Sequence, residues 1–467
     1  MNDTDKEIDL LLDTARQAQS RFEAQGDQQL FDRAAAAAAW ALMHPERNAE
    51  LAKLAVAETG LGNVADKITK NHRKTLGLMR DIKDQTSYGL ISDNSATGIS
   101  EYLRPKGVVA AIVPSTNPLA TPVNNIVNAL KTGNAIILAP SPKGAVPLAA
   151  LIGYIHAEFD KNSLDRNLVQ MVPTPPSKAK TARLMAGADM LVVTGSQSNV
   201  RAAYSSGTPA IGVGAGNVVT IIDETSDLDA AAIKIAQSKC FDNATSCSSE
   251  NAIIIVDAVY DDMVAALGRA GGMLLDDAQT ERLIVTHWQD GHLNRNMLAQ
   301  DIDKVLDQLD LTNIAPKNTK FLLAPATGIG ASHPISGEKM ALFAALYRAN
   351  DFSDAKEKAR QILAYQGQGH SLGLHSSDDQ RAHNLAAYMP VCRVIVNQAH
   401  CFATGGSFDN GLPFSLSMGC GSWGGNSIDE NLNWTHFVNH VRIARPIPPS
   451  EPSLDDIFAD YWRETAS

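Results

Sequence analysis

The stretch GVVAAIVPSTNPLATPVNNIVNALKTGNAIILAP (residues 107–140) joins two short apolar runs through a turn rich in Pro, Ser and Asn and a segment of helical length. Apolar runs of the same kind, each ending in Gly or Pro, return at residues 168–173, 189–195 and 208–214. Such runs, alternating with helical segments, are typical of parallel strands joined by crossover helices. They predict an α/β fold with a doubly wound parallel sheet, whose ligands bind at the carboxyl ends of the strands.

A second series of apolar runs follows: ENAIIIVD (250–257), KFLLAPA (320–326), KMALFAALYRA (339–349), SLGLHSS (371–377) and CRVIVNQ (392–398). Before both series, residues 1 to about 80 carry apolar side chains three and four positions apart, which predicts helices. A chain of 467 residues is too long for one ordinary core. We therefore expect two α/β domains, with a boundary in the polar turn at residues 223–226.

The composition is that of a globular protein, with 44% hydrophobic and 19% charged residues. A net charge of −11 argues against a nucleic-acid partner, because phosphate binding needs a basic face. Five cysteines without regular spacing do not make a disulfide framework, which favours a reducing compartment. The acidic first residues are unlike a signal peptide, and the apolar stretches are too short to span a membrane. We expect a cytoplasmic protein with no membrane partner.

Cys247 lies in FDNATSCSSENAIIIV (241–256), among small polar residues and just before an apolar run. A structural cysteine usually has apolar neighbours, so Cys247 is a candidate nucleophile. Three turns that follow predicted strands share one edge of the sheet: VPSTNP (113–118), VVTGS (192–196) and AIGVGAGN (210–217). In the first of these turns, backbone N–H groups and the Asn117 amide are candidates to face a ligand. The alternative is that Asn117 caps a helix before Pro118.

A rival interpretation comes from GHSLG (369–373), which fits the G-x-S-x-G pattern of a serine hydrolase with Ser371 as nucleophile. That pattern requires a strand before the serine and a helix after it. Here a charged helical stretch precedes the motif and a predicted strand follows it. The order favours a plain turn between a helix and a strand, and the hydrolase is kept as the alternative from another class.

Four stretches carry a resemblance to a known family: IVPSTNP (112–118), AAYSSGTPAIGVGAGN (202–217), FDNATSCSSE (241–250) and GCGSWGGNS (419–427). Together they resemble the aldehyde dehydrogenase superfamily, over residues from about 100 to 443. Within it, the chain is most similar to the CoA-acylating branch. The resemblance implies an aldehyde dehydrogenase-like α/β fold, with two doubly wound domains and a small β element through which copies associate.

This resemblance also divides the chain. We expect residues 1–223 to form the N-terminal helices and the dinucleotide-binding domain, to which residues at about 420–435 return. Residues 224–419 form the expected catalytic thiol domain. The segments 97–105 and 436–444 match the strands through which family members form a homodimer or homotetramer, and residues 445–467 form a C-terminal tail.

The resemblance implies that the Cys247 thiolate adds to an aldehyde carbon while Asn117 and the Cys247 backbone N–H hold the oxyanion. Hydride transfer to a nicotinamide then leaves a thioester. Hydrolytic members carry a water-activating glutamate in E-L-G-G-K, and Gly212 occupies that position here. Without this base, hydrolysis loses a contribution of about 100- to 10,000-fold. We therefore expect coenzyme A to accept the acyl group, and expect the nearby Glu250 to have a structural role.

The cofactor is expected to be NADP, or NAD. In the family the strand within residues 136–144 leads to the adenosine ribose, and this chain has no acid there to bind a 2′-hydroxyl. Ser141 and Lys143 are placed instead to meet a 2′-phosphate. Glu338 matches a family glutamate that binds the nicotinamide ribose. Further cofactor contacts are expected from Pro114, Ser115, Thr116, Gly195, Ser196, Gly212, Val213 and Gly214. No metal site is expected.

The substrate pocket is expected in residues 397–419, a stretch rich in Asn, Ser, Thr and Gly. Its candidate lining residues are His400, Thr404 and Ser407, which suit a short polar or anionic aldehyde. Since the overall pattern looks like that of acylating enzymes for sulfoacetaldehyde, this aldehyde is the leading candidate, and succinic semialdehyde and acetaldehyde stay open. Cys401, beside His400, is not expected to be a second nucleophile, because neighbouring residues on a strand point to opposite faces.

Overall fold

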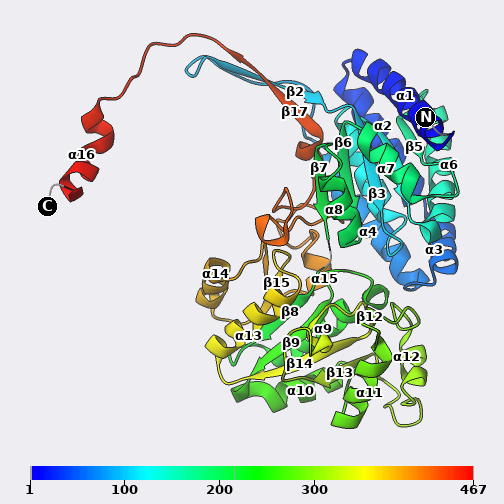
Figure 1. The fold of residues 1–467 in the computed structure, drawn as a ribbon, viewed down its shortest axis with the longest axis vertical. Helices are drawn as coiled ribbons and strands as arrows, with labels where there is room; N and C mark the ends of the chain where they lie inside the picture. Colours follow the sequence, from blue (N-terminus) through cyan, green and yellow to red (C-terminus); the bar gives the residue numbers. More distant parts are fainter. Residues whose placement is uncertain (1–2, 215, 466–467) are drawn as a thin grey trace.

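The computed structural model describes residues 3–214 and 216–465, which form two α/β units stacked along the long axis and an extended arm (Figure 1). The chain begins with the predicted helices α1 (Asp3–Ala24), α2 (Gln28–Met43), α3 (Pro45–Thr59) and α4 (Val64–Ile82). The alanine-rich α2 is a strong helix former. Pro45 then ends α2 and begins α3, where its missing N–H leaves no hydrogen bond unmade.

The first unit contains a five-stranded parallel sheet in the order β5-β4-β3-β6-β7. Its strands are β3 (Val108–Val113), β4 (Ala135–Pro140), β5 (Val169–Met171), β6 (Met190–Thr194) and β7 (Ala210–Val213). Its crossover helices are α5 (Ala120–Lys131), α6 (Ala145–Lys161), α7 (Lys178–Gly187) and α8 (Gln197–Tyr204). Strand β3 is central: β4 and β5 lie on one side of it, and β6 and β7 on the other. The connections after β3 and β6 therefore run in opposite directions. This is a topological switch point, where such sheets bind nucleotides.

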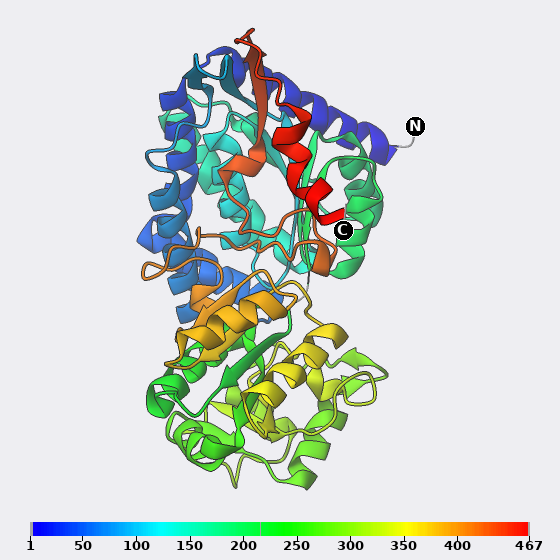
Figure 2. The same cartoon turned by 90° about the vertical axis from the view of Figure 1, so that its left-hand side faces the viewer.

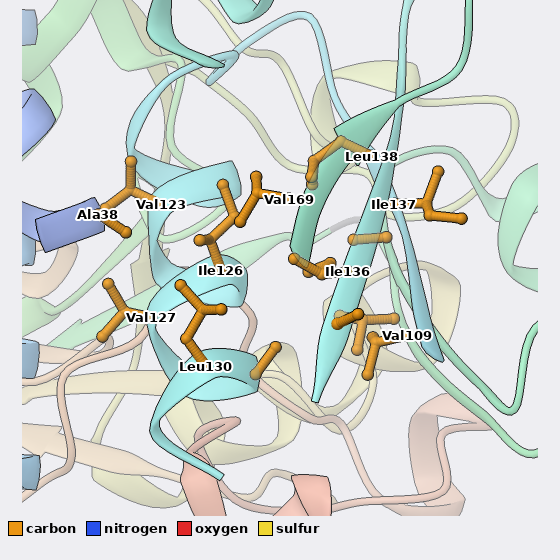
Figure 3. Packing of buried hydrophobic residues seen from close by; sticks show 14 of the residues in the cluster. Ala38, Val109, Val123, Ile126, Val127, Leu130, Ile136, Ile137, Leu138 and Val169 are labelled. Carbon is orange, nitrogen blue, oxygen red and sulfur yellow. The ribbon is translucent and has the colours of Figure 1, made fainter. Parts of the chain in front are cut away.

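Helix α5 is packed between this sheet and α2 (Figure 3). The packed side chains are fully buried: Ala38, Val123, Ile126, Val127, Leu130, Ile136 and Leu138. A helix buried on all sides is held by close packing, so shortening Leu130 to alanine would cost about 2–5 kcal/mol of stability. This packing fixes the start of α5, and with it the loop after β3 that carries Asn117.

The second unit contains a seven-stranded parallel sheet in the order β10-β13-β14-β9-β8-β15-β16. Its strands are β8 (Val218–Ile222), β9 (Glu250–Val256), β10 (Gly272–Leu274), β13 (Phe321–Pro325), β14 (Phe343–Ala349), β15 (Leu372–His375) and β16 (Val394–Val396). Its helices are α9 (Leu228–Cys240), α10 (Tyr260–Arg269), α11 (Asp277–His287), α12 (Ile302–Gln308), α13 (Phe352–Tyr365), α14 (Asp379–Tyr388) and α15 (His400–Ala403). A small hairpin joins β11 (Trp288–Gln289) to β12 (His292–Leu293). The predicted pair of doubly wound α/β units is confirmed.

The boundary between the units differs from the predicted turn at residues 223–226. Strand β8 pairs with β9 and β15, so the second sheet already includes Val218. Asp223, at the end of β8, is buried and forms an ion pair with Arg381 of α14. The polar turn therefore marks the end of a strand within the second unit, and the chain crosses between the units before β8.

A three-stranded antiparallel sheet forms the arm, with β2 (Ile99–Pro105) between β1 (Gly89–Asn94) and β17 (Val438–Ala444). Just before β17, Leu432 and Phe437 are buried in the core of the first unit. After β17 a Pro-rich segment leads to α16 (Leu454–Thr465), which has no buried residue and lies away from both units (Figures 1 and 2). None of the helices in the described part of the chain is long and apolar enough to cross a membrane.

Candidate active site

A cavity of about 1000 Å³ lies where the two units meet. One part of its wall consists of the loops at the carboxyl ends of β3, β4 and β6 in the first unit. The facing part comes from the loop that precedes β9, together with residues near 340, 401 and 416–418. The third part is one face of α4. The cavity therefore joins a nucleotide-type sheet edge to the loop that carries Cys247.

Ten of the residues singled out in the sequence lie in this wall: Pro114, Ser115, Thr116, Asn117, Ser141, Gly195, Ser196, Gly214, Cys247 and Glu338. The first four follow β3, and Gly195 and Ser196 follow β6, so both loops of the switch point open into the cavity. Ser141 and Ser196 also accept hydrogen bonds from the backbone N–H groups of Gly144 and Asn199. These bonds hold the turns that face the cavity.

Three predicted cofactor residues lie elsewhere. Lys143 is exposed, two residues after Ser141. Gly212 and Val213 are buried in β7 and do not belong to the cavity wall. Ala215, within the same glycine-rich stretch, lies outside the described residues.

The loop before Cys247 has an unusual backbone. Asp242, Asn243 and Ala244 have φ angles of 48°, 52° and 59°, in the left-handed region. This conformation costs a non-glycine residue roughly 1–2 kcal/mol. It is held in place by side chains: the Asp242 carboxylate forms ion pairs with Lys67 and Lys70, and the Asn243 amide donates to Asp301 at 2.8 Å. Such a strained but tightly bonded loop fixes the position of the next residues.

Cys247 itself is half-buried, and its Sγ lies 4.0 Å from the Ser248 hydroxyl. Burial raises the pKa of the thiol to about 11, and the Glu338 carboxylate adds to this rise. The same burial raises the pKa of Glu338 to about 7, which the Gly216 N–H opposes by donating to the carboxylate. Near neutral pH the free protein therefore holds Cys247 as a thiol, near a carboxyl group whose pKa burial has raised.

The sequence interpretation missed one wall of the cavity, which is formed by Lys70 and Lys74 of α4. The run KITKNHRK (67–74) was assigned only to the N-terminal helices. The sequence does contain a signal for this wall, because lysines at positions 67, 70 and 74 recur at helical spacing and so share one face of the helix. Other missed wall residues are Phe241, Thr245, Cys401, Leu416 and Met418.

The residues predicted for the substrate pocket, His400, Thr404 and Ser407, are not part of the cavity wall. Residues 400–403 form helix α15, so the expectation that His400 and Cys401 lie on a strand is wrong. His400 turns inward and Cys401 faces the cavity. Thr404 donates to the His400 carbonyl at 2.8 Å, and Ser407 accepts from Arg73 at 2.6 Å. All three predicted residues support the wall from behind.

Ser371 is fully buried between two histidines. Its hydroxyl lies 2.7 Å from His370 Nδ1 and 2.8 Å from His400 Nε2. It follows α13 and precedes β15, which is the predicted turn between a helix and a strand. Ser371 does not belong to the cavity wall, so no substrate reaches it there, and the structure does not support the hydrolase alternative.

No carboxylate at the Gly212 position faces Cys247, and the surroundings leave no space for one. A Cβ atom on Gly212 would lie 2.7 Å from Val200 Cγ1 and 3.1 Å from the Tyr204 ring. Glu250 is also unsuited to activate water, because it is buried behind the wall, with its carboxylate bonded to Ser238 and to the His400 backbone. Neither position 212 nor Glu250 therefore presents a carboxylate to the cavity as a base for hydrolysis.

The chain belongs to the aldehyde dehydrogenase family, whose sequence profile matches residues 1–411. It is 55% identical to the sulfoacetaldehyde dehydrogenase (acylating) of Cupriavidus necator, over 96% of this chain and 91% of the relative. It is 37% identical to the succinate-semialdehyde dehydrogenase (acetylating) of Clostridium kluyveri, over 85% of this chain and 87% of the relative. The resemblance to the acylating branch is thereby confirmed.

Solved structures agree with the fold. An acetylating aldehyde dehydrogenase from Geobacillus thermoglucosidasius superposes with a TM-score of 0.92 at 31% identity, over 96% of this chain and 98% of that one. The two doubly wound units and the arm thus form the aldehyde dehydrogenase fold, as the four sequence motifs implied.

Proposed function

We propose that this protein is a CoA-acylating aldehyde dehydrogenase that oxidises a short anionic aldehyde, with sulfoacetaldehyde as the leading substrate, through a thioester on Cys247. The observation that carries the proposal is the position of Cys247. It lies in the wall of one cavity with both switch-point loops, and neither Gly212 nor Glu250 offers a base for hydrolysis. The names of the acylating relatives support the same reaction.

In the oxidative half, the Cys247 thiol releases its proton to solvent, and the resulting thiolate adds to the aldehyde carbon. The carbonyl oxygen becomes an oxyanion. The Asn117 amide lies in the same cavity wall, where together with the Cys247 backbone N–H it stabilises that charge. The switch-point loops in the cavity wall would hold a nicotinamide cofactor, which would supply the hydride acceptor for the oxidation of this carbon. The carbon is thereby oxidised, and an acyl thioester remains on Cys247.

In the second half, the acyl group leaves Cys247. The thiolate of coenzyme A attacks the thioester carbon, the Cys247 sulfur departs as a thiolate, and acyl-CoA is released. A thiolate is already a strong nucleophile and needs no general base in the site. The missing carboxylate at Gly212 removes the base that hydrolytic members use, which favours the thiol over water as acceptor.

The residues present fit a nicotinamide dinucleotide at the edge of the first sheet. Ser115, Thr116 and Gly195 line the switch point, where a pyrophosphate binds in doubly wound folds. Ser141 lines the cavity at the end of β4, Lys143 is exposed beside it, and residues 139–143 include no acid. This combination favours a 2′-phosphate, hence NADP, with NAD as the alternative. Glu338 lines the same cavity, and its proposed role is to accept hydrogen bonds from hydroxyl groups of the nicotinamide ribose.

The assembly and compartment are also proposals. All five cysteines are free thiols, which suits a reducing cytoplasm and a nucleophilic Cys247. The arm sheet exposes Leu90, Ile91, Val441 and Ile443. Apolar side chains on such a projecting sheet support a homodimer or homotetramer formed through β2 and β17.

A substrate panel tests the proposal. NAD(P)H formation is measured with CoA and either NADP or NAD, for sulfoacetaldehyde, succinic semialdehyde and acetaldehyde. We expect a CoA-dependent signal that is highest with sulfoacetaldehyde and lost in Cys247→Ala. Equal rates with all three aldehydes would contradict the anionic substrate, and a signal that survives Cys247→Ala would contradict the thioester.

A further inference from the structure

Two lysines of α4 point into the cavity that holds Cys247. Lys70 and Lys74 are four residues apart and share one helix face. Both are buried, with 7% and 8% of their surface exposed, yet both belong to the cavity wall. Lysine is rarely buried this far unless it is paired or binds something, so the pair requires an explanation.

Lys74 has no carboxylate partner in the described chain. Its Nζ donates to the carbonyl oxygens of Gly405 at 2.7 Å and Gly406 at 3.4 Å. An ammonium group has three donors, so one remains for a ligand. Burial, together with the neighbouring Arg73 charge, lowers the pKa of Lys74 to about 7. An anion placed against it would restore the missing counter-charge.

Lys70 adds to this positive end of the cavity. It shares the single carboxylate of Asp242 with Lys67, so two ammonium groups face one negative charge. Its Nζ also lies 3.2 Å from the Thr245 hydroxyl, another wall residue. Asp409 lies near Arg73, whereas Lys74 has no such carboxylate in the described chain, so the cavity face of α4 keeps an excess of positive charge.

The rest of the cavity wall near the two lysines is mostly apolar or weakly polar, and it is formed by Phe241, Cys401, Leu416 and Met418. A small molecule with one anionic end and a compact body matches such a surface. A lysine ammonium group is a compact charge with three donors, so it binds a tetrahedral sulfonate as readily as a planar carboxylate.

We propose that Lys70 and Lys74 form an anion subsite that holds the charged end of the aldehyde while Cys247 attacks its carbonyl carbon. This inference rests on the proposed function for its substrate class. It replaces His400, Thr404 and Ser407 as the residues that select the substrate.

The kinetic test uses Lys74→Gln, which keeps an N–H donor for the Gly405 carbonyl, with Lys74→Met as a second variant. Lys83→Met, at an exposed lysine just after α4, is the matched control. Each is assayed with CoA on sulfoacetaldehyde and on neutral propionaldehyde. We expect both Lys74 variants to raise the KM for sulfoacetaldehyde at least about 30-fold and to change the KM for propionaldehyde far less. An equal loss on both substrates, or no loss on either, overturns the subsite.

A pH profile adds a second signature. Only the charged ammonium binds an anion, so the ratio of kcat/KM for sulfoacetaldehyde to that for propionaldehyde should fall as pH rises above about 7. The groups facing Lys74 are Arg73 and Lys70 on its own helix and the thiols of Cys401 and Cys247 opposite. Glu338 lines the same cavity and its pKa is raised to about 7, so its ionisation would also repel an anion over this range. The profile is therefore repeated in Lys74→Gln, where a fall that belongs to Lys74 must disappear. A flat ratio would contradict the assignment.

A binding test separates this inference from the proposed function. Ethanesulfonate, which has no carbonyl group, should protect Cys247 from alkylation in the wild-type protein and in Lys83→Met, and should fail to protect it in Lys74→Gln. A wild-type protein without CoA-dependent turnover of either aldehyde would overturn the proposed function alone, because protection by the sulfonate does not need turnover. Absence of protection in the wild type would overturn the subsite.

Discussion

Lys70 of α4 forms a buried ion pair with Asp242, five residues before Cys247. The pair joins the N-terminal helices to the strained loop that presents the thiol, and Lys67 binds the same carboxylate at 3.1 Å. Although burial alone would raise it, the two ammonium charges hold the pKa of Asp242 below its ordinary value. The Asp242 carboxylate therefore joins the lysines of α4 to the loop that positions Cys247.

Asp242→Asn should destabilise the protein by about 3–5 kcal/mol, because it leaves two buried ammonium groups without a counter-charge. Denaturant unfolding measures this, and Asp81→Asn, at a partly exposed residue paired with Arg80, is the control. Since the folded pKa of Asp242 lies below the unfolded value, its stabilisation is complete above about pH 4 and is lost as pH falls through the folded pKa. The variant should lack this acid-dependent loss, and an unchanged acid profile would contradict the account.

The free thiol of Cys247 should titrate far above the ordinary cysteine range. Burial raises its pKa to about 11, so its alkylation rate should rise about tenfold per pH unit up to that value. Iodoacetamide labelling followed by mass spectrometry isolates Cys247 from the other thiols, with Cys247→Ser as the blank. Glu338→Gln should lower the midpoint, because the carboxylate adds to the rise. A midpoint near 8.5, the ordinary thiol value, would exclude the buried environment.

Gly212→Glu should not create a hydrolase. Its Cβ meets Val200 and Tyr204, so we expect a loss of about 1–3 kcal/mol in stability and no release of free acid. Gly212→Ala adds the Cβ atom without the carboxylate, so it serves as the control for the steric effect. Sustained NAD(P)H formation without CoA in the glutamate variant would show that the carboxylate reaches the site.

Ser371→Ala should keep CoA-dependent dehydrogenase activity, since Ser371 lies outside the cavity wall. It should destabilise the fold by about 1–3 kcal/mol, because His370 and His400 lose their shared partner. Thermal unfolding and turnover are measured together, with Cys247→Ala as the inactive comparison. Ester hydrolysis that survives Cys247→Ala and disappears in Ser371→Ala would instead support a serine hydrolase.

Much of the fold could be predicted because its signals are local. Apolar runs ending in Gly or Pro gave the parallel strands, and Cys247 stood out among polar neighbours before β9. The domain boundary was misplaced because a polar turn ends a strand within a domain as readily as it ends the domain, and only the pairing of β8 with β9 and β15 distinguishes the two.

The substrate end of the site could not be predicted from nearby sequence. Lys74 lies 173 positions before Cys247, and the two line one cavity because α4 packs against residues 241–244, just before Cys247. His400 was assigned to the pocket by composition, but the short helix α15 turns it away and brings Cys401 forward. Which side of a short segment faces a cavity is decided by tertiary packing, and composition does not record it.

The central claim is that Cys247 can form a thioester that only a second thiol removes. Rapid mixing of the protein with NADP and sulfoacetaldehyde, without CoA, tests it by following NADPH. The account predicts a burst of one NADPH per Cys247 that then stops, and steady formation with an equal amount of acyl-CoA once CoA is added. Continued NADPH formation with release of free acid, at a comparable rate and without CoA, would contradict it.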